Sequence, residues 1–116
     1  MLYLSGPISP RYGRTVEQHI DAARVVYLRF VRAGVPVYCP HLEAAHPDAQ
    51  AVPYEDWLAY DFAVLEQCSA VLTLPNWEES RGAVREVAHA ITLGVPVFHD
   101  EATALMALTA HTPRSG

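Results

Sequence analysis

The sequence predicts an α/β fold built on an open, mostly parallel sheet with helices on both faces. Short apolar runs alternate with longer segments in which apolar residues recur every three or four positions. Glycine or proline follows several of these segments, as at Gly6-Pro7, Gly34 and Gly94. Short apolar runs bounded in this way are typical of buried strands, and the longer periodicity is typical of amphipathic helices. Because strands that alternate with helices form parallel sheets, we expect a flavodoxin-like sheet in the order 2-1-3-4.

Local signals place the elements along the chain. Thr15 and Gln18 have the spacing of a capping box, which predicts the start of the first helix. The second apolar run contains Pro36, which favours a strand at the edge of the sheet. Three prolines between residues 40 and 54 predict a long loop. The expected strands are 2–5, 35–39, 70–74 and 95–98; the expected helices lie between Thr15 and Gly34 and at 55–68, 80–93 and 101–110; a second loop is expected at 75–79.

The composition is that of a single small domain. The 116 residues predict one domain at residues 1–110 and a loose C-terminal tail at 111–116. The net charge is −5 and the eight cationic side chains, all arginines, form no basic stripe, so duplex nucleic acid is an unexpected partner. No apolar run is long enough to span a membrane, and no signal peptide precedes the first strand. We therefore expect a cytoplasmic protein.

Cysteine and histidine spacing gives no reason to expect a metal. Cys39, His41 and His46 lie close together in the sequence, but their spacing matches no zinc pattern. Two cysteines are too few for a disulfide framework in a chain of this length. No metal and no cofactor are therefore expected.

The predicted sheet order places the functional site between strands 1 and 3. Ligands of open α/β sheets bind beyond the carboxyl ends of the strands, where the strand order reverses. Residues 5–9 and 75–80 are the two loops expected to meet at that point. We therefore expect the substrate to lie between them.

Two carboxylates fall where apolar side chains are expected. On a helical wheel Asp61 lies within one apolar arc, formed by Trp57, Leu58, Val64, Leu65 and Cys68. Glu86 lies beside the apolar stripe of the following helix, near its start. A buried carboxylate is costly unless it is paired or hydrogen-bonded, and paired carboxylates cleave glycosidic bonds. The alternatives are an Asp61 that caps a loop or pairs with an arginine, and a solvated Glu86 near His89.

Three sequence segments resemble a known enzyme family. They are Tyr3-Leu4-Ser5-Gly6-Pro7-Ile8, Asp61 in the middle helix, and the run from Ser80 to Glu86 that opens the next helix. Together they resemble the nucleoside 2-deoxyribosyltransferase-like superfamily, which includes the 2'-deoxynucleoside 5'-phosphate N-hydrolases. The resemblance covers residue 2 to about residue 98. It implies cleavage of an N-glycosidic bond in a nucleoside or nucleotide, and a homodimer or larger homo-oligomer.

The resemblance also implies roles for individual residues. Glu86 is expected to be the nucleophile at the sugar C1', with Tyr3 orienting it. Asp61 is expected to assist the leaving base or to hold the sugar. The expected substrate-binding residues are Gly6, Pro7, Ile8, Ser9, Ser80 and Gly82.

Ser80 is the residue that favours a 5'-monophosphate. The family's transferases carry an acidic residue here, whereas its nucleotide hydrolases carry serine; a hydroxyl at a helix N-terminus can donate to a phosphate. Arg11, Arg14 or Arg81 could pair with that charge. Trp77 either stacks on the base or covers the helix beneath it. The alternatives to hydrolysis are base exchange between nucleosides and a non-catalytic nucleotide-sensing module of the same fold.

Overall fold

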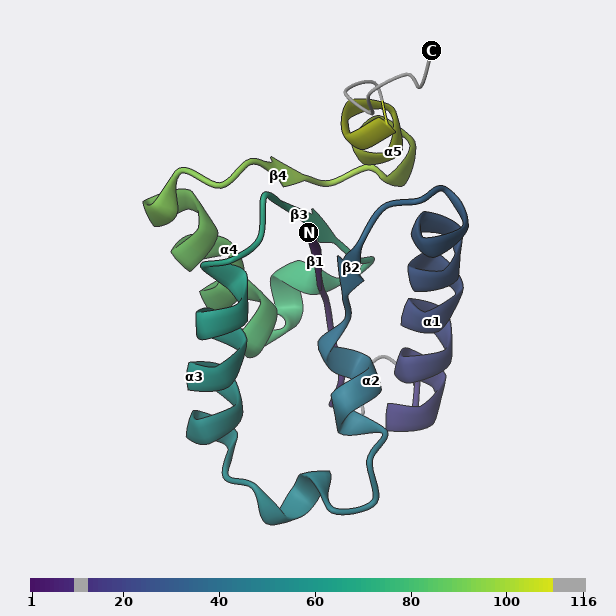
Figure 1. The fold of residues 1–116 in the computed structure, drawn as a ribbon. Helices are drawn as coiled ribbons and strands as arrows, with labels where there is room; N and C mark the ends of the chain where they lie inside the picture. Colours follow the sequence, from purple (N-terminus) through teal and green to yellow (C-terminus); the bar gives the residue numbers. More distant parts are fainter. Residues whose placement is uncertain (10–12, 110–116) are drawn as a thin grey trace.

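The computed structural model describes residues 1–9 and 13–109 and has the predicted α/β fold (Figure 1). Its sheet contains four parallel strands in the order β2-β1-β3-β4. The whole of β1 pairs with β3, from Leu2 beside Ala70 to Ser5 beside Thr73. The strands are β1 (Leu2–Ser5), β2 (Val37–Tyr38), β3 (Ala70–Thr73) and β4 (Val97–Phe98).

Helices cover both faces of this sheet. Figure 1 shows α3 and α4 on one side of the strands and α1 on the other. The expected tail at residues 111–116 lies outside the described residues. The helices are α1 (Val16–Arg32), α2 (Pro40–Ala44), α3 (Tyr54–Leu65), α4 (Arg81–Leu93) and α5 (Glu101–Thr109), with short 3₁₀ helices η1 (Ala49–Ala51) and η2 (Trp77–Glu79).

The predicted caps determine where the two longest helices begin and end. Thr15 and Gln18 form the complete capping box at the start of α1. Ser80 is the N-cap of α4, and its side chain accepts a hydrogen bond from the backbone N–H of Ala83. Gly94 ends α4 with a φ of 76°, in the left-handed region that glycine tolerates at a helix C-terminus.

The expected loop at residues 40–54 is wrong. This segment contains α2 and η1, with Pro40 in the first turn of α2. Proline favours that position because the first helical N–H groups need no partner within the helix, so a proline can begin a helix as well as interrupt one. The expected elements were also too long: β2 spans two residues, and α3 ends at Leu65, followed by turn hydrogen bonds from Gln67 and Cys68.

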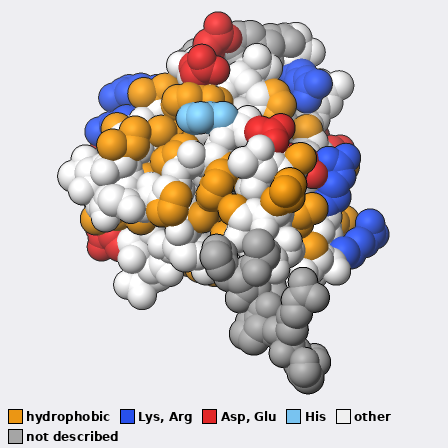
Figure 2. Space-filling view, turned by 90° about the horizontal axis from the view of Figure 1, so that it is seen from above, with side chains coloured by type: hydrophobic (Ala, Val, Ile, Leu, Met, Phe, Trp, Pro, Cys, Tyr) orange, Lys and Arg blue, Asp and Glu red, His pale blue; other side chains and the backbone are white. Residues whose placement is uncertain are grey.

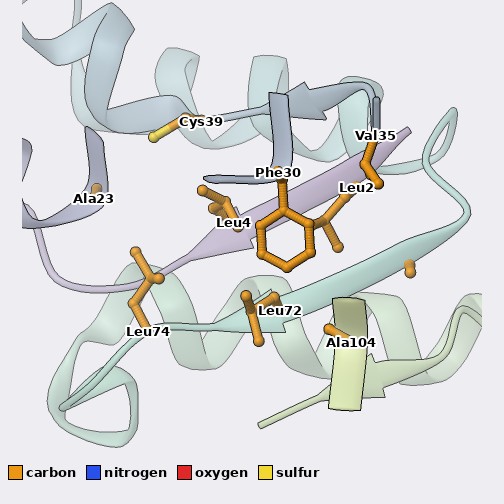
Figure 3. Packing of buried hydrophobic residues seen from close by; sticks show 10 residues of the cluster. Leu2, Leu4, Ala23, Phe30, Val35, Cys39, Leu72, Leu74 and Ala104 are labelled. Atoms are coloured by element: carbon orange, nitrogen blue, oxygen red, sulfur yellow. The ribbon is translucent and has the colours of Figure 1, made fainter. Parts of the chain in front are cut away.

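The alternation of side chains along β1 separates the molecule into two layers. Leu2 and Leu4 face α1 and α5, and Figure 3 shows Phe30 of α1 lying against both leucines. Tyr3 faces the other way and packs in a second cluster with Leu65 of α3 and Ala90 of α4. The residues of β1 that carry hydroxyl groups therefore point towards α3 and α4.

The surface near β4 and α5 carries mixed side chains. Seen from that end, hydrophobic side chains spread across the middle of the face, and arginine side chains lie near its edges (Figure 2). Met106 of α5 is 71% exposed. Within residues 1–9 and 13–109, no helix combines the length and apolar character needed to cross a membrane.

Candidate active site

Glu86 is a buried carboxylate that two hydroxyl groups hold in place. Its side chain projects from α4 and the residue is only 7% exposed. The hydroxyl of Tyr3 donates to Oε2 at 2.7 Å, and the hydroxyl of Ser5 donates to Oε1 at 2.7 Å. Tyr3 and Ser5 share one face of β1 because side chains alternate along a strand. The sheet therefore fixes both oxygens of Glu86.

Ser5 is a site residue that the sequence interpretation did not single out. Its signal was the period of two that separates it from Tyr3 in the first strand. A serine among apolar strand residues is unusual in the same way as Asp61 on an apolar helix face. Ser5 is fully buried, and its hydrogen bond to Glu86 compensates for the burial of its hydroxyl group.

Burial makes Glu86 unusually basic. Desolvation raises the pKa of its carboxyl group from 4.5 to about 7, although the hydrogen bonds from Tyr3 and Ser5 oppose the rise. The negative charge of Asp61 adds to it. Removal from water disfavours the charged form, whereas hydrogen bonds to the carboxylate favour it. At neutral pH a large fraction of Glu86 is therefore ionised and available as a nucleophile.

Asp61 is the second buried carboxylate, and it lies on α3. It is 9% exposed, and the hydroxyl of Tyr38 donates to its Oδ1 at 3.2 Å. Burial raises the pKa of Asp61 to about 6; the Tyr38 hydrogen bond lowers it, and the charge of Glu43 raises it. Its hydrogen-bond partner is thus a tyrosine of β2 rather than an arginine. The alternative for Glu86 also fails, because His89 bonds to Glu66 at 3.2 Å and stacks on Phe62.

Both carboxylates line one pocket of about 430 Å³. Gly6 follows β1 and lines the pocket, and a Cβ there would lie 2.7 Å from the Cβ of Leu74, so only glycine fits. Glu43 of α2 is a third acidic residue of the wall that sequence patterns did not indicate. Of the expected substrate-binding residues, the pocket brings together Gly6, Ile8, Ser9, Ser80 and Gly82 with Asp61 and Glu86.

A smaller hollow of about 180 Å³ continues the pocket towards the start of α4. Arg81 lies at this hollow, with its guanidinium 5.7 Å from the ring centre of Tyr54. Ser80 accepts a hydrogen bond from Ala83 and so keeps its own O–H proton for a further partner. The hollow is lined by Pro7, Ile8, Ser9, Tyr54, Ser80, Arg81 and Gly82.

The structure places Trp77 and Arg14 elsewhere. Both line a separate pocket of about 890 Å³ beside α1, and Trp77 stacks on His99 with ring centres 5.2 Å apart. Asn76 adopts a left-handed conformation just before η2. The next residue along the chain that lines the Glu86 pocket is Ser80. This placement disfavours base stacking by Trp77 and phosphate binding by Arg14. Arg11 lies outside the described residues.

His41 holds the loop that follows β1. Burial lowers its pKa to about 4, so the ring is neutral near pH 7. Its Nε2 lies 3.0 Å from the carbonyl oxygen of Pro7. The neutral ring can donate to that oxygen only in the tautomer that carries its proton on Nε2. Its Nδ1 lies 3.7 Å from the sulfur of Cys39. Cys39 and His41 thus shape the wall of the site, and the described residues contain no group of three or more potential metal ligands.

Glu86→Gln is expected to be more stable than the wild type at pH 8. Because the folded pKa lies near 7, above the ordinary 4.5, the Glu86 contribution to stability is complete below pH 4.5 and is lost as pH rises through 7. The difference between these two pKa values corresponds to about 3 kcal/mol in the free energy of unfolding. The variant loses one hydrogen bond that the carboxylate accepts, which offsets about 1 kcal/mol of this stabilisation. Glu86→Gln therefore gains about 2 kcal/mol in the free energy of unfolding at pH 8.

Thermal unfolding followed by circular dichroism at pH 8 and pH 4 measures this effect. We expect the melting temperature of the variant to exceed that of the wild type by roughly 5–10 °C at pH 8. The gain should disappear near pH 4, where the wild-type side chain is protonated. If the melting temperatures of variant and wild type differed equally at pH 8 and pH 4, that result would contradict an ionisable Glu86 with a raised pKa.

Sequence comparison places the chain in a family. No curated protein matches it in sequence. A family described as a domain of unknown function, DUF4406, matches residues 1–99, a range that includes β1 to β4 and every residue of the Glu86 pocket. The chain belongs to the DUF4406 domain family.

Proposed function

We propose that this protein cleaves the N-glycosidic bond of a nucleoside or deoxynucleoside 5'-monophosphate, with Glu86 as the nucleophile. The observation that carries the proposal is the Glu86 carboxylate itself. It is buried, held by two hydroxyl donors, and shares one pocket with a second buried carboxylate. Desolvated carboxylate pairs cost stability, and glycosidic-bond cleavage is one chemistry that uses such a pair.

Glu86 begins the reaction by attacking C1' of the sugar. A bond forms between a carboxylate oxygen and C1' while the C1'–N bond breaks, and its electron pair leaves with the base. A proton from Asp61 or from solvent neutralises the departing base. Water then attacks C1' and gives its proton to Asp61 or to solvent, while the bond between C1' and Glu86 breaks and its electron pair returns to the carboxylate; the sugar phosphate is released. The hydroxyls of Tyr3 and Ser5 keep both oxygens aimed throughout.

The hollow beside Ser80 supports a phosphate at the 5' end of the sugar. Ser80 offers an O–H donor at the positive end of α4, and Arg81 adds a cationic side chain. The described residues of the hollow include no carboxylate that would repel a phosphate. Arg81 therefore replaces Arg14 as the proposed charge partner.

Incubation of the protein with matched nucleosides and 5'-monophosphates tests the function. Chromatography should show free base and sugar phosphate from at least one monophosphate. Adding a second free base distinguishes the alternatives, because base exchange would produce a new nucleoside. Binding without release of base from any substrate would contradict the hydrolase and favour a sensing module.

Hydrolysis should depend on pH through Glu86. Since only the ionised carboxylate attacks C1', kcat/KM should fall about tenfold for each pH unit below 7. At pH 5 the value should be roughly one hundredth of that at pH 8. A flat profile between pH 5 and pH 8 would contradict a Glu86 nucleophile with a raised pKa.

The setting proposed for this activity is a homo-oligomer in the cytosol. Tyr60 of α3 and Ile91 of α4 are 50% and 66% exposed, which supports packing of a second copy beside the site. The free cysteines Cys39 and Cys68 are both buried and fit a reducing compartment. Light scattering in solution measures the assembly directly.

A further inference from the structure

Two tyrosines stand in register behind the two carboxylates. Tyr3 of β1 and Tyr38 of β2 are direct neighbours in the sheet, with ring centres 5.5 Å apart. Tyr3 donates to Glu86, and Tyr38 donates to Asp61. Neither tyrosine lines the 430 Å³ pocket, whereas both carboxylates do. Each phenol therefore reaches the pocket only through the carboxylate it holds.

Asp61 has an acidic neighbour, and among the described residues one hydroxyl group donates to it. The negative charge of Glu43 on α2 raises the pKa of Asp61, and the negative charge of Asp61 raises the pKa of Glu86. In the described part of the chain, the hydroxyl of Tyr38 donates to Oδ1, and no described residue hydrogen-bonds to Oδ2. The Tyr38 ring is itself held between Tyr3 and Tyr60.

We propose that Tyr38 is a positioning residue that acts through Asp61: its hydroxyl fixes Oδ1 and leaves Oδ2 to meet the substrate. A carboxylate without this contact could rotate about its last bond and bind a proton more tightly. The inference rests on the proposed function for its kinetic consequences. Its structural consequence is a changed titration of Asp61, which can be measured without substrate turnover.

Tyr38→Phe removes the hydroxyl and keeps the ring. We expect the pKa of Asp61 to rise by about one unit, because a hydrogen bond to the charged form is lost. The measurement is a carbon-13 NMR titration of aspartate carboxyl groups, with Asp61→Asn assigning the signal. Tyr60→Phe is the matched control, since Tyr60 contacts the same ring and is half exposed. An unchanged Asp61 titration in Tyr38→Phe would overturn the inference.

Kinetics separate positioning from a general structural effect. Tyr38→Phe should lower kcat about tenfold and leave KM within about twofold, because Tyr38 does not line the pocket. In an Asp61→Asn background the same change should have no further effect on kcat, since its route to the substrate has been removed. Independent, additive losses would overturn the inference.

A second variant covers the case in which Tyr38→Phe does not fold. Site-specific 3-fluorotyrosine at position 38 keeps the ring and makes the phenol a stronger donor, so the pKa of Asp61 should fall. No change in that variant would again overturn the inference. If no substrate is turned over by the wild type, the proposed function fails, and the Asp61 titrations still decide whether Tyr38 positions the carboxylate.

Discussion

Glu86→Gln is expected to lower kcat by about 10³-fold or more, which corresponds to about 4 kcal/mol of activation free energy. Glutamine keeps the size of the side chain and one oxygen that can accept from Tyr3 or Ser5. It cannot form the bond to C1', because an amide is a poor nucleophile. The variant should fold, since it replaces a desolvated carboxylate by a neutral group.

The measurement is single-substrate kinetics on the best monophosphate found in the panel. Glu66→Gln is the matched control, because Glu66 is an exposed residue that pairs with His89 away from the pocket. That control should retain wild-type turnover. Near-normal activity in Glu86→Gln would remove the nucleophile from the mechanism.

Ser80→Asp is expected to reverse the preference for a monophosphate over its nucleoside. We expect the wild type to favour the monophosphate by roughly 10²-fold in kcat/KM, equivalent to about 2.7 kcal/mol. That energy comes from the helix N-terminus, at about 0.3–1 kcal/mol, and from charge-assisted hydrogen bonds of about 1.5–3 kcal/mol. The aspartate would place a fixed negative charge where the phosphate binds.

Capping chemistry makes this substitution easy to interpret. Aspartate and asparagine both cap helices as well as serine does, so α4 should keep its N-terminus in either variant. Ser80→Asn is therefore the neutral control and should retain a preference for the monophosphate. Equal kcat/KM for both substrates in the wild type would contradict the nucleotide assignment and favour a nucleoside substrate, with Glu86 unaffected.

Short-range signals in the sequence located most of the fold. Thr15 and Gln18 predicted the start of α1, Gly34 and Gly94 predicted helix ends, and alternation of strands and helices predicted the sheet order. These signals are reliable because capping and backbone conformation depend on a few neighbouring residues. The same reasoning failed at residues 40–54, since proline is compatible with both a loop and the first turn of α2.

The burial of Asp61 and Glu86 could also be predicted, because helical periodicity determines which residues share a face. Periodicity does not specify a partner. Sheet pairing places Tyr38 beside Tyr3 and so brings a hydroxyl to Asp61, which lies 23 positions further along the sequence. Tyr3 and Glu86, the other pair, lie 83 positions apart in the sequence and are brought together in the same way.

The sequence by itself determined the fold class, the strand order, the caps of α1 and α4, one carboxylate on an apolar helix face and a second carboxylate beside the apolar stripe of the next helix. The tertiary structure alone decided which side chains surround those carboxylates. It brought Ser5, Tyr38 and Arg81 to the site and left Trp77 and Arg14 at another pocket. The reason is physical: helix and turn preferences arise within a few residues, whereas the neighbours of a buried group depend on strand register and layer packing between distant segments.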